Sequence, residues 1–227
     1  DNKLVIKNLS AGTTYKFRVN AYRSAYGKAL ESDGVEISVL TKPAAVTGLK
    51  VKSRSNGSIT MKWNKVSSAD GYIVYRYTGK TFKRIKTITS KNSVTFISSG
   101  LTAGTEYKYR VASYKKNGKT VLEGGYAGIS DITLPVAPVV TAKAGSKKAM
   151  LAWRRVKGAN GYVVYMSTSK KGTYKRIATL NSAKKVRYTK TKLKKGKTYY
   201  FKVRAYKRYK GKTYFSSYST VRTAKVK

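Results

Sequence analysis

The sequence repeats itself at an offset of 90 residues, and this repeat limits the possible architecture more than any other feature. Residues 57–63 align with residues 147–153, and residues 71–75 align with residues 161–165. Self-similarity at a fixed spacing indicates copies of one structural unit. A unit of about 90 residues lies within the usual size range of a domain. The chain is therefore predicted to be a tandem array of similar modules.

A later part of the unit occurs three times, and in each copy a leucine precedes a tyrosine by six residues. The three pairs are Leu9 and Tyr15, Leu101 and Tyr107, and Leu193 and Tyr199. The first copy has no counterpart of residues 57–63 before it, so the chain is expected to open in mid-module. Three explanations stay open for residues 1–42: an expression or proteolytic boundary, a longer chain, or completion by strands of another molecule.

Local patterns indicate β-strands along the whole chain. Short runs alternate between apolar and polar side chains, are rich in Val, Ile, Thr and Tyr, and end at Gly, Asn or Ser. No long apolar stripe recurs at helical spacing. The predicted fold class is all-β. Two complete modules are expected at residues 43–135 and 136–227, preceded by the C-terminal part of a module at residues 1–42.

Three of the spaced motifs resemble the pattern of fibronectin type III domains. They are a tryptophan on the second strand (Trp63 and Trp153), Gly-Tyr-x-Val on the third strand, and the leucine–tyrosine step before the sixth. The resemblance covers essentially the whole chain and implies tandem immunoglobulin-like β-sandwiches. It also implies that the tyrosine of the step forms a corner, in which its hydroxyl bonds to the backbone just upstream. Alternation along the strand makes both tryptophans core residues.

Shorter stretches, such as residues 159–162 and 194–206, are similar to modules of secreted or cell-wall-associated proteins of Gram-positive bacteria. This similarity implies a location outside the cell and a role in spacing or anchoring another domain. The chain does not start with a signal peptide, and no apolar stretch approaches the length of a transmembrane helix.

The chain is strongly basic, and its charge is uneven. Fifty Lys and Arg against eight Asp and Glu give a formal net charge of +42. Residues 136–227 hold 27 of the basic residues and no acid, whereas residues 1–135 hold 23 of them and all eight acids. Such charge favours a polyanionic partner. The expected partner is an anionic polysaccharide or a teichoic acid-like polymer. Nucleic acid is expected to bind only nonspecifically, because no recognition motif is present.

The residue inventory argues against catalysis, a metal and a cofactor. The chain has no His and no Cys, so it lacks imidazole bases, thiol nucleophiles and nearly all transition-metal ligand sets. The eight acids form no motif and fall mostly in predicted turns or at strand ends: Asp1, Glu31, Asp33, Glu36, Asp70, Glu106, Glu123 and Asp131. We therefore expect a protein that is not an enzyme and that has no catalytic, cofactor-binding or metal site.

The outward face of the last module is the predicted binding site. On its sixth strand Tyr199, Phe201 and Val203 should point inward, so the intervening residues should point outward. Together with two neighbouring strands they would interleave cations with tyrosines, an arrangement suited to an anionic polymer. The residues proposed to bind polyanions are Tyr165, Lys175, Arg176, Tyr200, Lys202, Arg204 and Tyr206. Exposed strands favour tyrosine and lysine for structural reasons as well, so this alternative stays open.

The sequence thus predicts a non-catalytic extracellular spacer or attachment segment of a bacterial surface or secreted protein. Its basic modules would bind an anionic wall polymer or glycan. The alternative is a structural subunit of a surface filament or assembly, in which a partner chain or a second copy completes residues 1–42 in trans.

Overall fold

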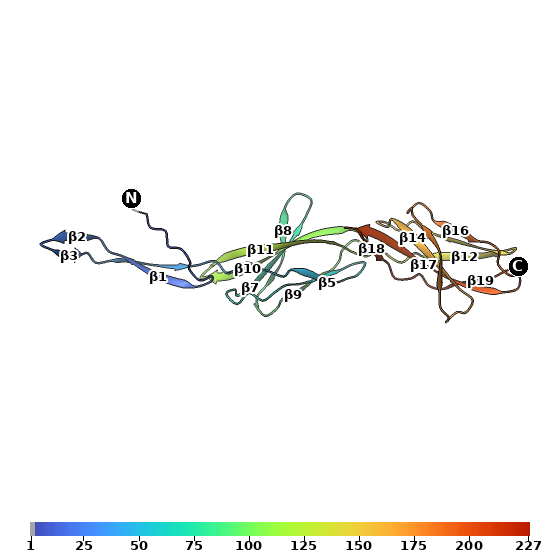
Figure 1. The fold of residues 1–227 in the computed structure, drawn as a ribbon, viewed down its shortest axis with the longest axis horizontal. Helices are drawn as coiled ribbons and strands as arrows, with labels where there is room; N and C mark the ends of the chain where they lie inside the picture. The colour runs from blue at the N-terminus through green and yellow to red at the C-terminus, as the bar shows by residue number, and fades with distance from the viewer. Residues whose placement is uncertain (1–2) are drawn as a thin grey trace. The chain divides into compact units, whose positions relative to one another are not determined.

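The computed structural model describes residues 3–227, and Asp1, one of the eight acids, lies outside the described residues. The described chain consists of strands and turns without a helix, as predicted (Figure 1). Two compact units are present: residues 1–50, 61–96 and 108–130, and residues 51–60, 97–107 and 131–227. Each unit joins residues from both sides of a boundary expected from the repeat, so those boundaries stay predictions.

Near the N-terminus, two antiparallel strand pairs form. β1 (Thr14–Val19) pairs with β4 (Val35–Leu40), and β2 (Tyr22–Ala25) pairs with β3 (Lys28–Glu31). On β1 and β4 one face is apolar, because its residues lie opposite one another in the register: Tyr15, Phe17, Val19, Val35, Ile37 and Val39. Val35 is 74% exposed and Val19 is 68% exposed. An apolar sheet face is therefore left open to solvent in this segment.

Two sheets follow between residues 50 and 132. The larger has the order β11 (Thr120–Ile132), β10 (Glu106–Asn117), β7 (Gly71–Tyr77) and β8 (Phe82–Ile88). The smaller has the order β5 (Lys50–Arg54), β6 (Ile59–Lys62) and β9 (Thr95–Ser98). Trp63 is buried, and its ring meets the ring of Tyr72 edge to face with centroids 5.2 Å apart. The prediction that Trp63 is a core residue is confirmed.

The same arrangement recurs between residues 140 and 225. A three-stranded sheet has the order β12 (Val140–Gly145), β13 (Lys148–Trp153) and β16 (Arg187–Lys190). The larger sheet has the order β15 (Lys175–Leu180), β14 (Gly161–Ser167), β17 (Thr198–Tyr209) and β18 (Lys212–Phe215), and β19 (Arg222–Lys225) also pairs with β17.

The core of this last sandwich lies between its two sheets. Leu151 and Trp153 of β13 belong to the same buried cluster as Phe201 and Val203 of β17. Trp153 meets Tyr162 at a centroid distance of 5.2 Å, as its counterpart does in the preceding repeat. The predicted inward direction of Trp153, Phe201 and Val203 is confirmed.

The tyrosine corner expected from the resemblance is present in all three copies. The backbone N–H of Ser10 donates to the hydroxyl of Tyr15 at 2.8 Å. Thr102 N–H donates to Tyr107 at 2.8 Å, and Lys194 N–H donates to Tyr199 at 3.1 Å. Each bond links the loop before the strand to the strand itself, so the repeated leucine–tyrosine step has one structural role throughout.

A candidate polyanion-binding face

The outer face of the larger sheet in the last sandwich carries most of the predicted binding residues. Along the pairing of β14 with β17, Ser167 lies opposite Tyr200, Tyr165 opposite Lys202, and Val163 opposite Arg204. Along the pairing of β14 with β15, Tyr165 lies opposite Arg176. Directly paired residues share a face. We call the surface of Val163, Tyr165, Arg176, Tyr200, Lys202, Arg204 and Tyr206 the outer face.

Lys175 does not lie on the outer face, and its prediction is corrected. It is paired with Met166, whose side chain packs against the core cluster on the other side of the sheet. Consecutive strand residues point to opposite faces, so Lys175 and Arg176 cannot share one. Lys175 is exposed at the start of β15 but is directed away from the outer face.

Tyr165 and Tyr206 are on the outer face but do not offer their rings to a ligand. Tyr165 is 8% exposed and Tyr206 is 3% exposed. Together with Val163 they form a second small buried cluster, covered in part by Tyr174 and Phe215. Their assignment as stacking residues is corrected, because other side chains already occupy the space next to their rings.

Phe215 reaches this cluster through a tight hairpin. Lys210 and Gly211 both have positive φ angles, 46° and 72°, which is the conformation of a two-residue type I′ turn. The turn sets the register of β18 on β17, with Tyr206 opposite Phe215. The sequence at the turn therefore decides which aromatic side chain covers Tyr206.

Arg204 is held by aromatic rings from three sides. Its guanidinium carbon lies 3.8 Å from the ring centroid of Phe215, 4.9 Å from that of Tyr218 and 5.2 Å from that of Tyr165. Its Nε and Nη2 groups donate to the Tyr165 hydroxyl at 3.0 and 2.6 Å. Cation–π attraction and two hydrogen bonds thus stabilise a positive charge without any carboxylate.

Lys202 has a similar but looser environment. Its ammonium group lies 4.1 Å from the ring centroid of Tyr174 and 5.6 Å from that of Tyr218. Burial raises the pKa of Tyr218 above its ordinary value, Arg204 lowers it, and Tyr165 raises it further. Burial, and to a smaller extent Tyr200, also raises the pKa of Tyr174. These tyrosines therefore stay neutral at physiological pH and do not cancel the charge of the cations.

A small hollow of about 170 Å³ lies beside this network. Val163, Tyr206 and Phe215 contribute apolar surface to it, and its remaining lining residues are Arg176, Thr179, Arg208 and Thr213. Both arginines and both threonines are exposed. The volume is below that of a pocket for a drug-sized ligand. It suits a single ring or charged group of a longer polymer.

Four residues that line the hollow are absent from the predicted binding residues: Thr179, Arg208, Thr213 and Phe215. Arg208 could have been found by continuing the alternation of β17 two residues beyond Tyr206. Thr213 and Phe215 required the hairpin register, in which Arg208 lies opposite Thr213.

Comparison with known proteins agrees with this architecture. Residues 44–124 match the fibronectin type III domain family. A two-domain fibronectin type III segment of chicken tenascin superposes with a TM-score of 0.51 at 20% identity, over 80% of this chain and 99% of that one. The fold is that of tandem fibronectin type III domains. The all-β fold of tandem β-sandwiches expected from the resemblance is thereby confirmed, and the family match itself extends over residues 44–124, whereas an origin in Gram-positive bacteria stays a prediction.

Curated relatives match parts of this chain within much longer proteins. Receptor-type tyrosine-protein phosphatase eta of Gallus gallus is 32% identical over 148 residues, which is 65% of this chain and 10% of that protein. Poly(3-hydroxybutyrate) depolymerase of Ralstonia pickettii is 36% identical over 70 residues, which is 31% of this chain and 13% of that protein. This chain thus spans only about a tenth of these relatives.

Fibronectin type III domains are typically non-catalytic and are typical of extracellular spacer and adhesion segments. Within residues 3–227, no set of three or more acidic, His or Cys side chains is grouped so that it could hold a metal ion. The same residues include no helix with the length and hydrophobicity needed to span a membrane.

Proposed function

We propose that this chain is a non-catalytic spacer and attachment segment of a secreted or cell-surface bacterial protein, and that its last module binds an anionic wall polymer or glycan. One observation carries the proposal. Residues 136–227 hold 27 basic residues and no acid, and two of these cations, Arg176 and Arg208, line the hollow beside the outer face. The match to a bacterial depolymerase supports a spacer that adjoins other domains.

Binding would combine many weak ionic contacts with one shaped contact. Exposed cations displace counterions from the polymer, so affinity should fall steeply with salt, as it does for nucleic acids. Arg176 and Arg208 would take the charged group of one polymer unit, while the half-buried ring of Phe215 contributes apolar surface beneath it. Lys202 and Arg204 add positive potential from within the aromatic network.

The experiment measures binding of the whole chain to immobilised dextran sulfate and to teichoic acid over a salt series. Charge reversal of Arg176→Glu with Arg208→Glu should weaken binding about tenfold at low salt. The matched control is Lys83→Glu with Lys86→Glu, which changes the net charge equally at exposed positions of β8. Equal losses in the two double variants would reject the outer face as a site.

A second candidate function rests on the apolar face of β1 and β4. Exposed Val19, Val35 and Ile37 would be covered if strands of another copy completed the sandwich by packing against this face, giving a subunit of a filament or assembly. Light scattering coupled to size-exclusion chromatography tests it. Mass that rises with concentration, and that returns to the monomer in a Val35→Lys, Ile37→Lys variant, would support assembly. A monomer at every concentration would reject it.

A further inference from the structure

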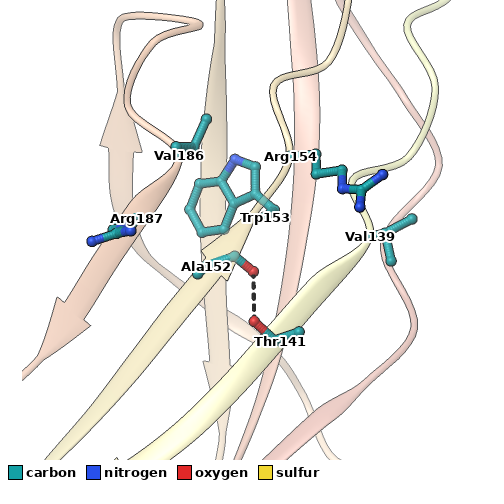
Figure 2. A pocket seen from close by; sticks show the side chains of 7 residues that line it. All are labelled: Val139, Thr141, Ala152, Trp153, Arg154, Val186 and Arg187. Carbon is teal, nitrogen blue, oxygen red and sulfur yellow. Dashed lines mark hydrogen bonds between the residues drawn. The ribbon is translucent and has the colours of Figure 1, made fainter.

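A second concave surface lies on the other side of the last sandwich, on the outer face of the three-stranded sheet. Two adjoining hollows of about 460 and 560 Å³ share Thr141, Ala152 and Arg187. Figure 2 shows the side chains that line the first of them. Thr141 lies opposite Ala152, and Ala152 lies opposite Arg187, so these three residues form one row across the sheet. We call the two hollows together the sheet groove.

The groove is open because its central residue is small. Ala152 occupies the position that Lys62 occupies in the preceding repeat, one residue before the core tryptophan in both cases. Lys62 is an exposed residue of β6. A lysine at position 152 would extend its side chain across the floor of the groove. The two repeats thus differ at this position by one long cationic side chain.

The lining of the groove combines an aliphatic floor with hydroxyls and cations. Ala152, Met150 and Val139 provide the aliphatic surface, and Val139 is 73% exposed. The Thr141 hydroxyl donates to the Ala152 carbonyl at 3.2 Å, which leaves its lone pairs able to accept. Figure 2 shows Arg154 and Arg187 on opposite sides of Ala152 and Thr141.

This lining favours a sugar polymer over a nucleic acid. Single-stranded nucleic acids are held by exposed aromatic rings on which bases stack. The one aromatic residue that lines the groove, Trp153, is 6% exposed and packs on Tyr162 in the core. The aliphatic floor can contact the C–H groups of a sugar ring without such a stacking platform. Arginine binds carboxylate and sulfate groups in a bidentate manner.

We propose that the sheet groove is a second binding site, and that its ligand is an extended polysaccharide carrying carboxylate or sulfate groups. A sugar ring lies over Ala152 and Met150, and its anionic groups contact Arg154, Arg187 and Lys143. The groove and the outer face belong to opposite sheets of one sandwich. The last module can therefore hold two polymer chains at once and join them. The ligand class is that of the proposed function, but the residues are different.

The decisive variant is Ala152→Lys, because it adds a positive charge while it fills the floor. Binding of the whole chain to dextran sulfate and to polygalacturonate should weaken about fivefold, in spite of the added charge. The matched control is Thr168→Lys, which adds the same charge at an exposed turn residue and should leave binding unchanged or slightly stronger. If Ala152→Lys binds as tightly as Thr168→Lys, net charge alone governs binding and the groove is not a site.

Both variants are measured in the wild-type chain and in the chain with Arg176→Glu and Arg208→Glu. The groove predicts that Ala152→Lys weakens binding by the same factor in both backgrounds. If Arg176→Glu with Arg208→Glu does not weaken binding but Ala152→Lys does, the outer-face site of the proposed function is contradicted and the groove is supported. An effect of Ala152→Lys that vanishes in the double variant would overturn the second site.

Joining of polymer chains provides a readout that monovalent binding does not give. The wild-type chain mixed with long dextran sulfate should produce turbidity at low salt, and Ala152→Lys should abolish it while retaining binding. If Ala152→Lys produces as much turbidity as Thr168→Lys does, the module does not hold two polymer chains through two sites. The fold is checked by thermal unfolding, and Ala152→Ser, which keeps the floor open, should bind like the wild type. Single-stranded DNA that displaces polygalacturonate at equal charge concentration would reject the sugar preference.

Discussion

Tyr75 and Tyr165 occupy the same position in two copies of the repeat, but their hydroxyls have opposite partners. Tyr75 donates to the carboxylate of Glu123 at 2.6 and 2.8 Å. Tyr165 accepts hydrogen bonds from the guanidinium of Arg204. In both copies the register shifts just before the tyrosine, and the tyrosine lies opposite an arginine of the next strand. The scaffold is thus the same, and only the sign of the partner differs.

The contrast extends to the other charges. The region of residues 50–132, which we call the middle region, contains the ion pairs of Arg54 with Asp131 and of Lys115 with Asp70. Residues 136–227 contain no acid, and there Arg204 and Lys202 lie on aromatic rings. A ring stabilises a cation without cancelling its charge. The last module can therefore keep its whole positive charge available to a ligand and still place cations within a packed surface.

The largest effect is expected from Arg204→Ala. This change removes the cation from three rings and leaves the Tyr165 hydroxyl without its donors, which should lower the free energy of unfolding by about 2–3 kcal/mol. Denaturant unfolding is followed by fluorescence in a Trp63→Phe background, so that Trp153 reports on the last sandwich. Arg204→Lys should recover part of the loss. A cost below about 0.5 kcal/mol would show that the rings merely surround the arginine.

A smaller difference is expected between the two tyrosines. Tyr165→Phe removes the acceptor of two charge-assisted bonds at a buried site and should cost about 1–2 kcal/mol. Tyr75→Phe removes a bond to an exposed carboxylate and should cost less than about 1 kcal/mol. The two variants are compared by the same fluorescence method, with Trp153→Phe as the background for Tyr75. Equal costs would mean that the sign of the partner has no energetic consequence.

Alkaline pH should separate the regions in a different way. Burial first, and Glu123 second, raise the pKa of Tyr75 to about 12 from its ordinary value of 10.0. A raised pKa in the folded state means that the neutral form stabilises the fold. This contribution is complete below pH 10 and is lost as the pH rises from about 10 to 12.

Ultraviolet titration of tyrosinate checks this expectation. Subtracting the curve of Tyr75→Phe should leave one group that titrates near pH 12. In Glu123→Gln the same group should titrate earlier but still above 10, because burial remains. A difference curve centred at pH 10 would contradict both causes.

The smallest effect concerns the ion pair of Lys115 with Asp70. Its atoms are 3.7 Å apart and partly exposed, so the pair itself should contribute less than about 0.5 kcal/mol. Asp70 also accepts from the backbone N–H of Lys116 at 2.9 Å. Asp70→Asn keeps an acceptor for that bond and should therefore have almost no effect on unfolding. A cost above about 1 kcal/mol would show that the acids of the middle region are structurally required.

Local periodicity was sufficient for the elements and for the core. Alternation places Trp63 and Trp153 inward, and the resemblance to fibronectin type III domains implies the three tyrosine corners, each of which forms within one loop and the strand after it. These features depend on nearby sequence. They can therefore be predicted from the sequence without knowing which strands pair.

The candidate binding face is only partly predictable from the sequence, because it depends on neighbours distant in sequence. Lys175 was misplaced because its direction follows from the pleat and register of β15 on β14. Alternation predicts that Tyr165 and Tyr206 are exposed, because it cannot show that Phe215 and Tyr174 pack over them. The sheet groove needed the pairing of β12, β13 and β16, although the change from Lys62 to Ala152 is visible in the repeat itself.

The aromatic environment of Arg204 also affects how such a module can change in evolution. The residues that hold the fold of the outer face are Arg204 and its rings, whereas the cations at the rim of the hollow, Arg176 and Arg208, are exposed and have no carboxylate beside them in the last sandwich. Mutations at the rim can alter the affinity for the proposed ligand with little effect on folding. If the last module binds a polyanion as proposed, a lineage could therefore change its affinity for that ligand one substitution at a time, without first acquiring stabilising mutations elsewhere.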